Sequence, residues 1–318
     1  MKQLKIFFLL FIEAFIMSTK AQPSIRKIVQ YSDSIQQILY NPVIDNNQAI
    51  VHLPIIDYVS TTIPMVEVLI GGYSYRFMFD TGTALSVFNI QYINQTPNDS
   101  LIVMGVMESP SSIDYASAVI AQKVELAGLT LKELPMVTTY FKNDKSQTHG
   151  IIGLSLVKGF DILFDWQKHE IILITPDSTD YFLDSQYGII QSLPVEFNTS
   201  NCLVTVESVI KGNRLELLID SGAFATFIPT NHGFLNRVKR RKDIDILKDR
   251  KSNKKTYKKT SITLGENHYR HIKVYQTKKA NSQKYNYDGI LGCDVLGKQP
   301  LLLSITKEKL LFLEHKSR

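Results

Sequence analysis

The fold is decided by Phe77-Met78-Phe79-Asp80-Thr81-Gly82-Thr83, because this stretch returns 140 positions later as Leu217-Leu218-Ile219-Asp220-Ser221-Gly222-Ala223. Each copy has an apolar run, an aspartate, a hydroxyl residue and a glycine in the same order. These polar residues are common in turns, so one copy alone would indicate only a turn at the end of a strand. Two copies indicate a duplicated structural unit.

The repeat continues on both sides of the turn. Residues 65–70 are typical of a strand, Gly71-Gly72 of a hairpin turn, and residues 75–79 of the returning strand. In the second copy the turn position is taken by Lys211-Gly212-Asn213. We therefore expect one β-hairpin in each half, with the aspartate at the end of its second strand.

A second matching block lies downstream, at an offset of 139 positions. The two copies are His149-Gly150-Ile151-Ile152-Gly153 and Asp288-Gly289-Ile290-Leu291-Gly292. Each is followed by a further predicted hairpin, at residues 162–174 and 301–313. The pattern predicts an all-β protein built from two similar halves.

The two Asp-(Thr/Ser)-Gly turns and the two apolar-apolar-Gly segments resemble the pepsin-like and retropepsin-like aspartic proteases. The resemblance spans residues 63–313, with two units fused in one chain as in pepsin. It implies a bilobal acid-protease fold with two β-barrel-like lobes and an active cleft between them. It also implies that one chain completes the site, so that the protein is a monomer.

The resemblance assigns the catalytic role to Asp80 and Asp220. Two carboxyl groups that share a site cannot both ionise cheaply, so a proton is held between them. Aspartic proteases are the well-known example of two carboxyl groups that share one proton. Because the groups interact, the pair titrates as a unit. The ionised carboxylate would activate water and the protonated one would polarise the scissile carbonyl of a peptide or protein substrate. The implied activity is that of an aspartic-type endopeptidase, a peptide hydrolase.

Neighbouring residues would support the pair. In this family Thr81 and Ser221 would supply hydroxyl groups that link the two loops. Gly82 and Gly222 fit a close approach of the two backbones, where a side chain would crowd the loops.

The residues after the two glycines differ in a way that affects the pair. Thr83 can donate a hydrogen bond to Asp80 and so favour its ionised form, whereas Ala223 offers no such donor to Asp220. Ala223 thus removes one stabiliser of the charged form near Asp220, and we expect a pH optimum less acidic than that of pepsin-like enzymes with hydroxyl groups at both positions.

Two features would shape substrate binding. A flap is expected between residues 101 and 120, with Tyr115 as a candidate substrate-binding residue or, equally, an ordinary strand tyrosine.

Residues 237–259 carry twelve Lys or Arg and three Asp. This local excess of positive charge is larger than the net charge of +6 of the whole chain. Such a run is usually a solvated loop, and the alternative is a basic rim that steers acidic substrates. Tyr257 is its only aromatic residue, so we expect no nucleic-acid partner.

The N-terminus predicts export. Lys2 and Lys5 precede an apolar stretch at residues 6–17 and then small residues, which is the layout of a signal peptide cleaved near Ala21. An uncleaved anchor is the alternative, and no other segment predicts a membrane span. The expected organisation is a signal peptide at 1–21, a leading strand or pro-segment at 22–59, lobes at 60–178 and 195–318, and a linker at 179–194.

The remaining composition limits the chemistry. The resemblance requires no cofactor, and His268 and His271 have no Cys or carboxylate at ligand spacing, so no metal site is predicted. Cys202 and Cys293 could form one disulfide in an exported chain or stay free. The main alternative to the endopeptidase is a catalytically silent or highly specialised peptide-binding or processing protein on the same fold.

Overall fold

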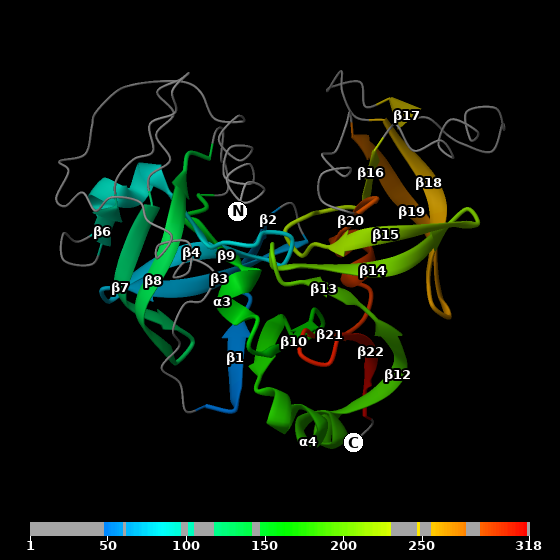
Figure 1. The fold of residues 1–318 in the computed structure, drawn as a ribbon, viewed down its shortest axis with the longest axis horizontal. Coiled ribbons are helices and arrows are strands. Elements are labelled where there is room, and N and C mark those ends of the chain that lie inside the picture. The colour runs from blue at the N-terminus through cyan, green and yellow to red at the C-terminus, as the bar shows by residue number, and fades with distance from the viewer. Residues whose placement is uncertain are drawn as a thin grey trace. The chain divides into compact units, whose positions relative to one another are not determined.

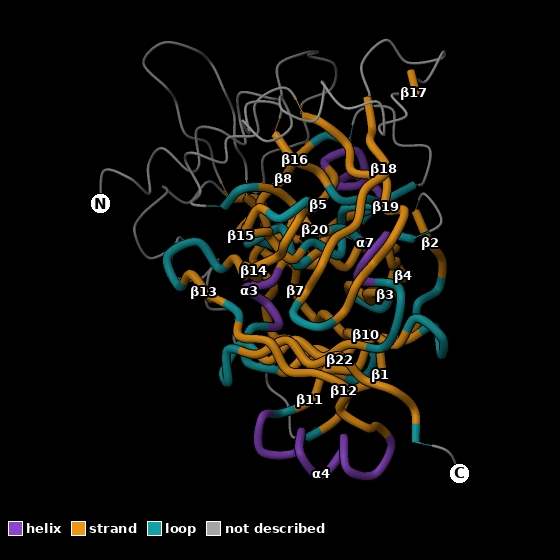
Figure 2. Tube along the Cα trace, turned by 90° about the vertical axis from the view of Figure 1, so that its right-hand side faces the viewer, coloured by secondary structure: helices purple, strands orange, loops and turns teal. Residues whose placement is uncertain are grey.

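The computed structural model describes residues 48–59, 62–96, 101–104, 118–141, 147–229, 247–248, 256–277 and 287–316. Over these residues the chain is mostly β-strand with few helices, as Figures 1 and 2 show. The prediction of an all-β class is confirmed at this level. The predicted signal peptide at 1–21, residues 22–47, Tyr115 and residues 237–246 lie outside the described residues.

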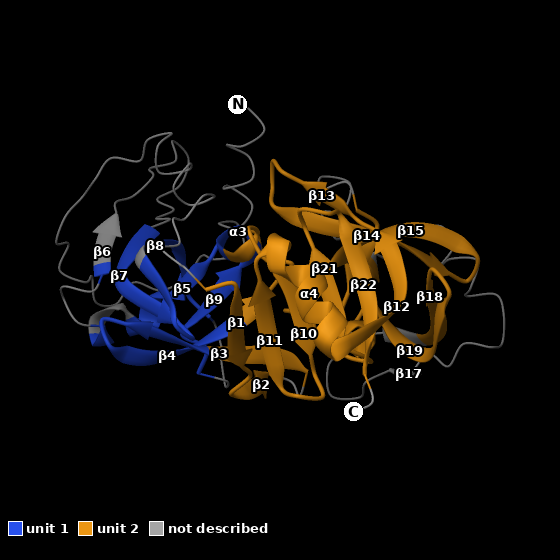
Figure 3. Ribbon diagram, turned by 90° about the horizontal axis from the view of Figure 1, so that it is seen from below, with its two compact units in different colours: residues 1–47, 67–78, 85–156 blue, residues 48–66, 79–84, 157–318 orange. Residues whose placement is uncertain are grey.

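The chain divides into two compact units (Figure 3). Among the described residues, unit 1 contains those of 67–78 and 85–156, and unit 2 contains those of 48–66, 79–84 and 157–318. Residues 179–194, expected as a linker, belong to unit 2, where they form most of a helix and a whole strand.

Unit 1 is built on a β-sheet whose strands follow the order β3-β4-β9-β5-β8-β7-β6. In β4 the side chains alternate, with Tyr75 and Phe77 buried and Arg76 and Met78 less so, as a strand that faces a core on one side requires. The elements are β3 (Ile63–Ile70), β4 (Tyr73–Asp80), β5 (Val87–Asn89), the 3-10 helix η1 (Ile90–Gln95), β6 (Leu101–Met104), β7 (Ala118–Leu126), β8 (Leu129–Thr139), β9 (Gly150–Gly153) and α3 (Leu154–Val157). The first residues of β3 and the last of β4 and α3 belong to unit 2.

Unit 2 contains the sheet β13-β14-β15-β20-β16-β19-β18-β17, whose eight strands follow the same order as β2-β3-β4-β9-β5-β8-β7-β6, the first sheet with β2 (Asp57–Val59) included. The elements are β13 (Glu196–Asn198), β14 (Leu203–Ile210), β15 (Asn213–Ile219), β16 (Phe227–Pro229), β17 (Leu247–Lys248), β18 (Thr256–Leu264), β19 (Asn267–Thr277), β20 (Gly289–Leu291) and α7 (Cys293–Leu296). The predicted hairpin around Lys211-Gly212-Asn213 is confirmed as β14–β15. Strand β2 (Asp57–Val59) pairs with the start of β3, as β13 pairs with β14.

A six-stranded sheet completes unit 2, in the order β1-β11-β10-β21-β22-β12. Both predicted downstream hairpins are confirmed here, as β10–β11 and β21–β22, and the centre of the sheet pairs Ile162 with Leu303. The elements are β1 (Ile50–Pro54), β10 (Asp161–Asp165), β11 (Glu170–Ile174), α4 (Pro176–Gln186), β12 (Tyr187–Pro194), β21 (Leu301–Ser304) and β22 (Lys309–His315). Since β1 pairs with β11, residues 50–54 fit the leading-strand alternative.

A hydrophobic core lies between this sheet and α4. Phe182 and Leu183 of α4 are buried against Leu163, Ile172 and other apolar residues of the sheet. Pro176 stands at the start of the helix, where a missing backbone N–H has no cost. The helix therefore packs against the sheet through the apolar side chains of its last turns.

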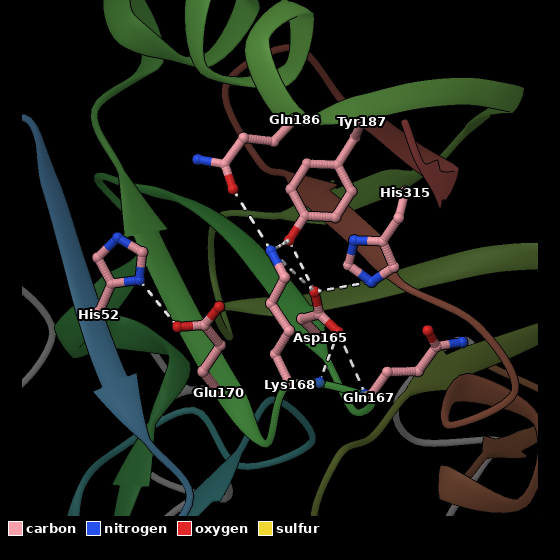
Figure 4. A network of polar contacts seen from close by, with 8 residues as sticks. All are labelled: His52, Asp165, Gln167, Lys168, Glu170, Gln186, Tyr187 and His315. Atoms are coloured by element: carbon pink, nitrogen blue, oxygen red, sulfur yellow. Dashed lines mark hydrogen bonds and ion pairs between the residues drawn. The ribbon is translucent and has the colours of Figure 1, made fainter. Parts of the chain in front are cut away.

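A polar network fastens one end of the six-stranded sheet (Figure 4). Asp165 is fully buried, and its Oδ2 atom accepts a hydrogen bond from the Tyr187 hydroxyl at 2.7 Å and lies 3.2 Å from Nε2 of His315. Its Oδ1 atom accepts from the backbone N–H groups of Gln167 and Lys168. The network joins β10, β12 and β22 around one buried carboxylate.

Neither cysteine is paired: Cys202 and Cys293 are both free and buried. Within the described residues, no helix combines the length and the apolar character that a membrane crossing needs.

Candidate functional site

The two repeated turns meet inside unit 2 and hold each other by reciprocal hydrogen bonds. The backbone N–H of Thr81 donates to Ser221 Oγ at 3.1 Å, and the N–H of Ser221 donates to Thr81 Oγ1 at 3.0 Å. Thr81 Oγ1 donates onward to the carbonyl of Ile219 at 2.9 Å, and Ser221 Oγ to that of Phe79 at 2.8 Å. Both hydroxyl groups are buried, so these bonds are shielded from water. The loops are linked as the resemblance implied.

The two glycines are there because the loops approach so closely. A Cβ atom added to Gly82 would clash with the carboxyl carbon of Asp220, and one added to Gly222 would clash with that of Asp80. Each glycine therefore packs directly against the aspartate of the other loop. No larger residue fits without moving one of the carboxyl groups.

Asp80 is held by donors from its own loop. Thr83 Oγ1 donates to Oδ2 at 2.7 Å, and the backbone N–H of Gly82 donates to Oδ1 at 2.8 Å. Burial raises the pKa of Asp80, and these hydrogen bonds partly oppose the rise by stabilising the carboxylate. Asp80 is therefore the better acceptor of the pair.

Asp220 shares the proton of the pair with Asp80, and its own pKa is raised. Burial raises its pKa well above the ordinary value, and the negative charge of Asp80 and a hydrogen bond donated to Asp80 raise it further. Ala223 supplies only a backbone N–H, which lowers the pKa less than these effects raise it. The Oδ1 atom of Asp220 is buried without a hydrogen-bond partner among the described residues. The predicted difference between Thr83 and Ala223 is thus present in the structure.

Two further residues lie at the site that the sequence pattern did not assign to it, Cys293 and Asp294. The backbone N–H of Cys293 donates to the Ala223 carbonyl at 2.8 Å, and its thiol donates to the Ser221 carbonyl at 3.2 Å. Burial, followed by the charge of Asp220, raises the pKa of the Cys293 thiol well above its usual value, so the group stays a neutral donor.

Asp294 is the second missed residue. Its Oδ1 atom accepts a hydrogen bond from Thr226 Oγ1 at 2.9 Å, and burial raises its pKa to about 6. The signal that could have found it is its place two residues after the second apolar-apolar-Gly segment, where the first repeat has Ser155. Unit 2 therefore carries a partly buried carboxyl group at the position where unit 1 has a serine.

The predicted residues of the two loops all lie together, whereas Tyr115 lies outside the described residues. Among the described residues, no three His, Cys, Asp or Glu side chains are grouped in a way that could hold a metal ion. The chemistry available at the loops is that of two carboxyl groups and one retained proton.

Comparisons with known proteins place the fold. No protein-family model and no curated protein matches the chain. Among solved structures, it is similar to conglutin gamma, a basic 7S globulin from lupine seeds, with a TM-score of 0.53 and 8% identity over 83% of this chain and 94% of that one. It is also similar to the basic 7S globulin from soybean, with a TM-score of 0.50 and 10% identity over 83% and 94% of the two chains.

These findings correct the sequence-based assignment. The similar structures are named as seed globulins and not as proteases, so the predicted membership of the pepsin-like and retropepsin-like proteases is wrong. The predicted peptide hydrolysis, endopeptidase activity and protease class are wrong with it. The paired turns had been interpreted as chemistry, but they belong to a fold, and a fold does not carry an activity with it. What the similarity shows is that this chain shares the fold of the basic 7S globulins.

Proposed function

We propose that the chain is a non-catalytic binding protein, in which Asp80 and Asp220 hold a neutral ligand through a hydroxyl group. The observation that carries the proposal is the packing of each aspartate against the glycine of the other loop, which brings two buried carboxyl groups together. Such a pair can keep one proton, so that one carboxyl group donates beside a second that accepts. Burial and the charge of Asp80 raise the pKa of Asp220, which favours a proton held by the pair. The unpartnered Oδ1 atom of Asp220 leaves further bonding capacity at the pair.

The donor and acceptor together select the class of ligand. An ammonium group has donors only and a carboxylate has acceptors only, so neither complements both members of the pair. A hydroxyl group donates and accepts at a single atom. A hydroxyl group therefore needs little space to complement both members of the pair. This suits two carboxyl groups whose loops leave no room for a Cβ atom at Gly82 or Gly222.

The proposal has a definite dependence on pH. The donor exists only while the pair keeps its proton, so binding is present at low pH and is lost as the pH rises through the raised pKa of Asp220. A carboxylate with an ordinary pKa, near 3.9 in a model peptide, would lose its proton at a much lower pH.

The test is a ligand-observed NMR titration with glycerol as the probe and glycerate as its anionic counterpart, from pH 4 to 9. We expect glycerol to bind and glycerate to be rejected, with glycerol binding falling as the pH rises. Asp220→Asn keeps a donor that does not titrate, so binding should persist and its pH dependence should vanish. Glu207→Gln, which removes an exposed carboxylate on β14, is the matched control and should behave as the wild type.

Two results would overturn the proposal. One is equal binding of glycerol and glycerate, which would show that the retained proton does not select the ligand. The other is cleavage of a mixed peptide pool that is lost in Asp80→Asn, which would show that the pair is catalytic.

Finer predictions are proposals of the same kind. We propose that the two repeats are the two lobes of a pepsin-type fold, which the equal strand order of their eight-stranded sheets supports. One chain supplies both aspartates, which supports a monomer. Export by the N-terminal signal peptide at residues 1–21 is proposed on the sequence pattern alone.

A further inference from the structure

Basic side chains gather on the outward face of the hairpin that β18 and β19 form (Figure 1). Exposure alternates along most of both strands, as it does in a hairpin that packs one face on a core. Lys259, Arg270 and His271 are all exposed on the outward side, and Lys259 lies directly opposite Lys273 in the ladder. We call Lys259, Arg270 and His271 the basic face.

A β-bulge brings two residues of the basic face together. The register of the ladder shifts between Thr260 and Ile262, so that Arg270 and His271 both stand opposite the single Ser261. His271 has a left-handed backbone conformation, with a φ angle of 60°. This conformation costs free energy in a residue that has a side chain, so it indicates a local requirement other than stability.

The equivalent hairpin of the first repeat lacks both the bulge and the charge. β7 and β8 keep one register over their whole ladder. From the turn to the same rung, β8 has five residues, 129–133, where β19 has six, 267–272. Residues 118–139 carry two Lys and two Glu, whereas residues 256–277 carry four Lys or Arg and one Glu. The fold therefore requires neither the inserted residue nor the basic face.

The basic face has no acidic partner in the part of the chain that the structure describes. No ion pair there involves any of its three side chains, although all three belong to described strands. By contrast, the exposed guanidinium group of Arg214 lies 2.9 Å from a carboxylate oxygen of Glu207. Basic groups without counter-charges raise the local positive potential, which attracts an anionic partner.

We propose that the basic face binds an acidic peptide in an extended conformation. Outward side chains on a strand repeat about every 6.6–6.8 Å, and a bulge adds a side chain without adding a rung. An extended peptide with Asp or Glu at every second position presents carboxylates at the same repeat. None of the residues of the basic face belongs to the carboxyl pair, so the peptide site is independent of the hydroxyl site.

The other surface of the hairpin favours a peptide over other polyanions. The described side chains of β18 and β19 include no exposed aromatic or large apolar group. Nucleic-acid bases would therefore have no aromatic side chain on which to stack, and a bilayer would receive no apolar anchor. A peptide that binds through its carboxylates needs neither.

The experiment measures fluorescence anisotropy of a labelled decapeptide of alternating Asp and Ser, added to the full chain at low ionic strength. A decapeptide of five Asp followed by five Ser is its match in charge and composition. We expect the alternating peptide to bind more tightly than the block peptide, and its binding to weaken as salt is added, because salt screens exposed charges.

Three substitutions locate the binding. Arg270→Gln removes a cation, His271→Gly removes a side chain where glycine suits the positive φ, and Lys259→Ala installs the counterpart Ala121 of the first repeat. We expect each to weaken binding of the alternating peptide by roughly two- to fivefold. Lys211→Gly is the matched control, because Lys211 is also exposed with a positive φ, of 51°, but lies in the β14–β15 turn.

Several results would overturn the proposal. Equal binding of the alternating and block peptides would show that spacing does not matter, and an equal loss in Lys211→Gly would show that only net charge does. Unchanged binding in all three variants, or no binding to the intact chain, would remove the basic face as a peptide site. Tighter binding of a DNA duplex or of phosphatidylserine vesicles, at equal charge, would assign it to another polyanion.

Discussion

At the scale of single residues, Asp294 shows how burial can outweigh a nearby positive charge, because its pKa is raised although Lys298 acts to lower it. Its Oδ2 atom is buried and has no hydrogen-bond partner among the described residues. Burial is the largest cause of its raised pKa, and the Thr226 hydroxyl opposes that rise only in part. The ionised form of Asp294 therefore destabilises the folded state.

Asp294→Asn should stabilise the protein at neutral pH. A folded pKa of about 6 means that stability is full below the unfolded pKa and is lost as the pH rises through 6. Removing the charge should recover about 2–3 kcal/mol above that pH and nothing at pH 4. Urea unfolding at both pH values measures this, with the exposed Asp184→Asn as control. An equal gain at both pH values would contradict the explanation.

Gly82→Ala should be among the most damaging single-methyl changes in the chain. The new Cβ atom would clash with the carboxyl group of Asp220, and overpacking of this kind costs about 1–3 kcal/mol or more. Gly159→Ala is the matched control, because a Cβ there meets nothing within 4 Å. Thermal unfolding of both variants decides the point. Equal melting temperatures would show that the loops can separate at little cost.

Only some residues of the site could be predicted from the sequence. Asp80 and Asp220 could be found because each sits in a repeated motif. For Asp294 and Cys293 the sequence offers only their place after the second apolar-apolar-Gly segment, since their roles depend on contacts with residues about seventy positions away. The burial of the pair, which raises the pKa of both carboxyl groups, is likewise a property of the assembled loops.

At the scale of elements, hairpins were predictable and their assembly was not. Turn residues and alternation identify β14–β15, β10–β11 and β21–β22 from local sequence. The pairing of β10 with β21 joins the two repeats, and nothing local to either strand signals it. Helix α4 was expected to be part of a connector, because its mixed polar sequence becomes helical only when Phe182 and Leu183 meet the sheet.

Tyr187→Phe should loosen the junction of these strands. The substitution leaves the buried Asp165 carboxylate without the donor at 2.7 Å, which costs about 1–3 kcal/mol. Hydrogen exchange should speed up in β12 and β22, the strands that the network joins. Tyr181→Phe on α4 is the control, and unchanged exchange in the Tyr187 variant would show that His315 and Lys168 suffice.

At the scale of the whole molecule, the repeat defines two equal strand orders, but the compact units do not follow the repeat. Residues 79–84 of the first copy belong to the same unit as the second copy. The carboxyl pair is thus assembled within one unit although its members come from both copies. The general class and the strand pattern follow from the sequence, whereas the function does not, because the fold is shared by proteins of different activity.

Separate halves should therefore fail to fold. We expect residues 48–194 and residues 195–318, expressed apart, to lack a cooperative thermal transition, because β10 and β12 lose β21 and β22 as partners. Mixing the two fragments should restore the transition and the near-ultraviolet circular dichroism of the intact chain. A cooperative transition in either fragment alone would refute this view.

The pairing of Ile162 with Leu303 at the centre of the six-stranded sheet also sets the order of events during synthesis. A strand that leaves the ribosome early must wait for a partner made much later, and such distant pairing slows folding. In the interval β10 and β11 form a hairpin with one bare edge, which can pair with other chains. The growing polypeptide is therefore most vulnerable to aggregation just before residues 301–315 emerge, and a chaperone that shields extended chain would be most useful at that moment.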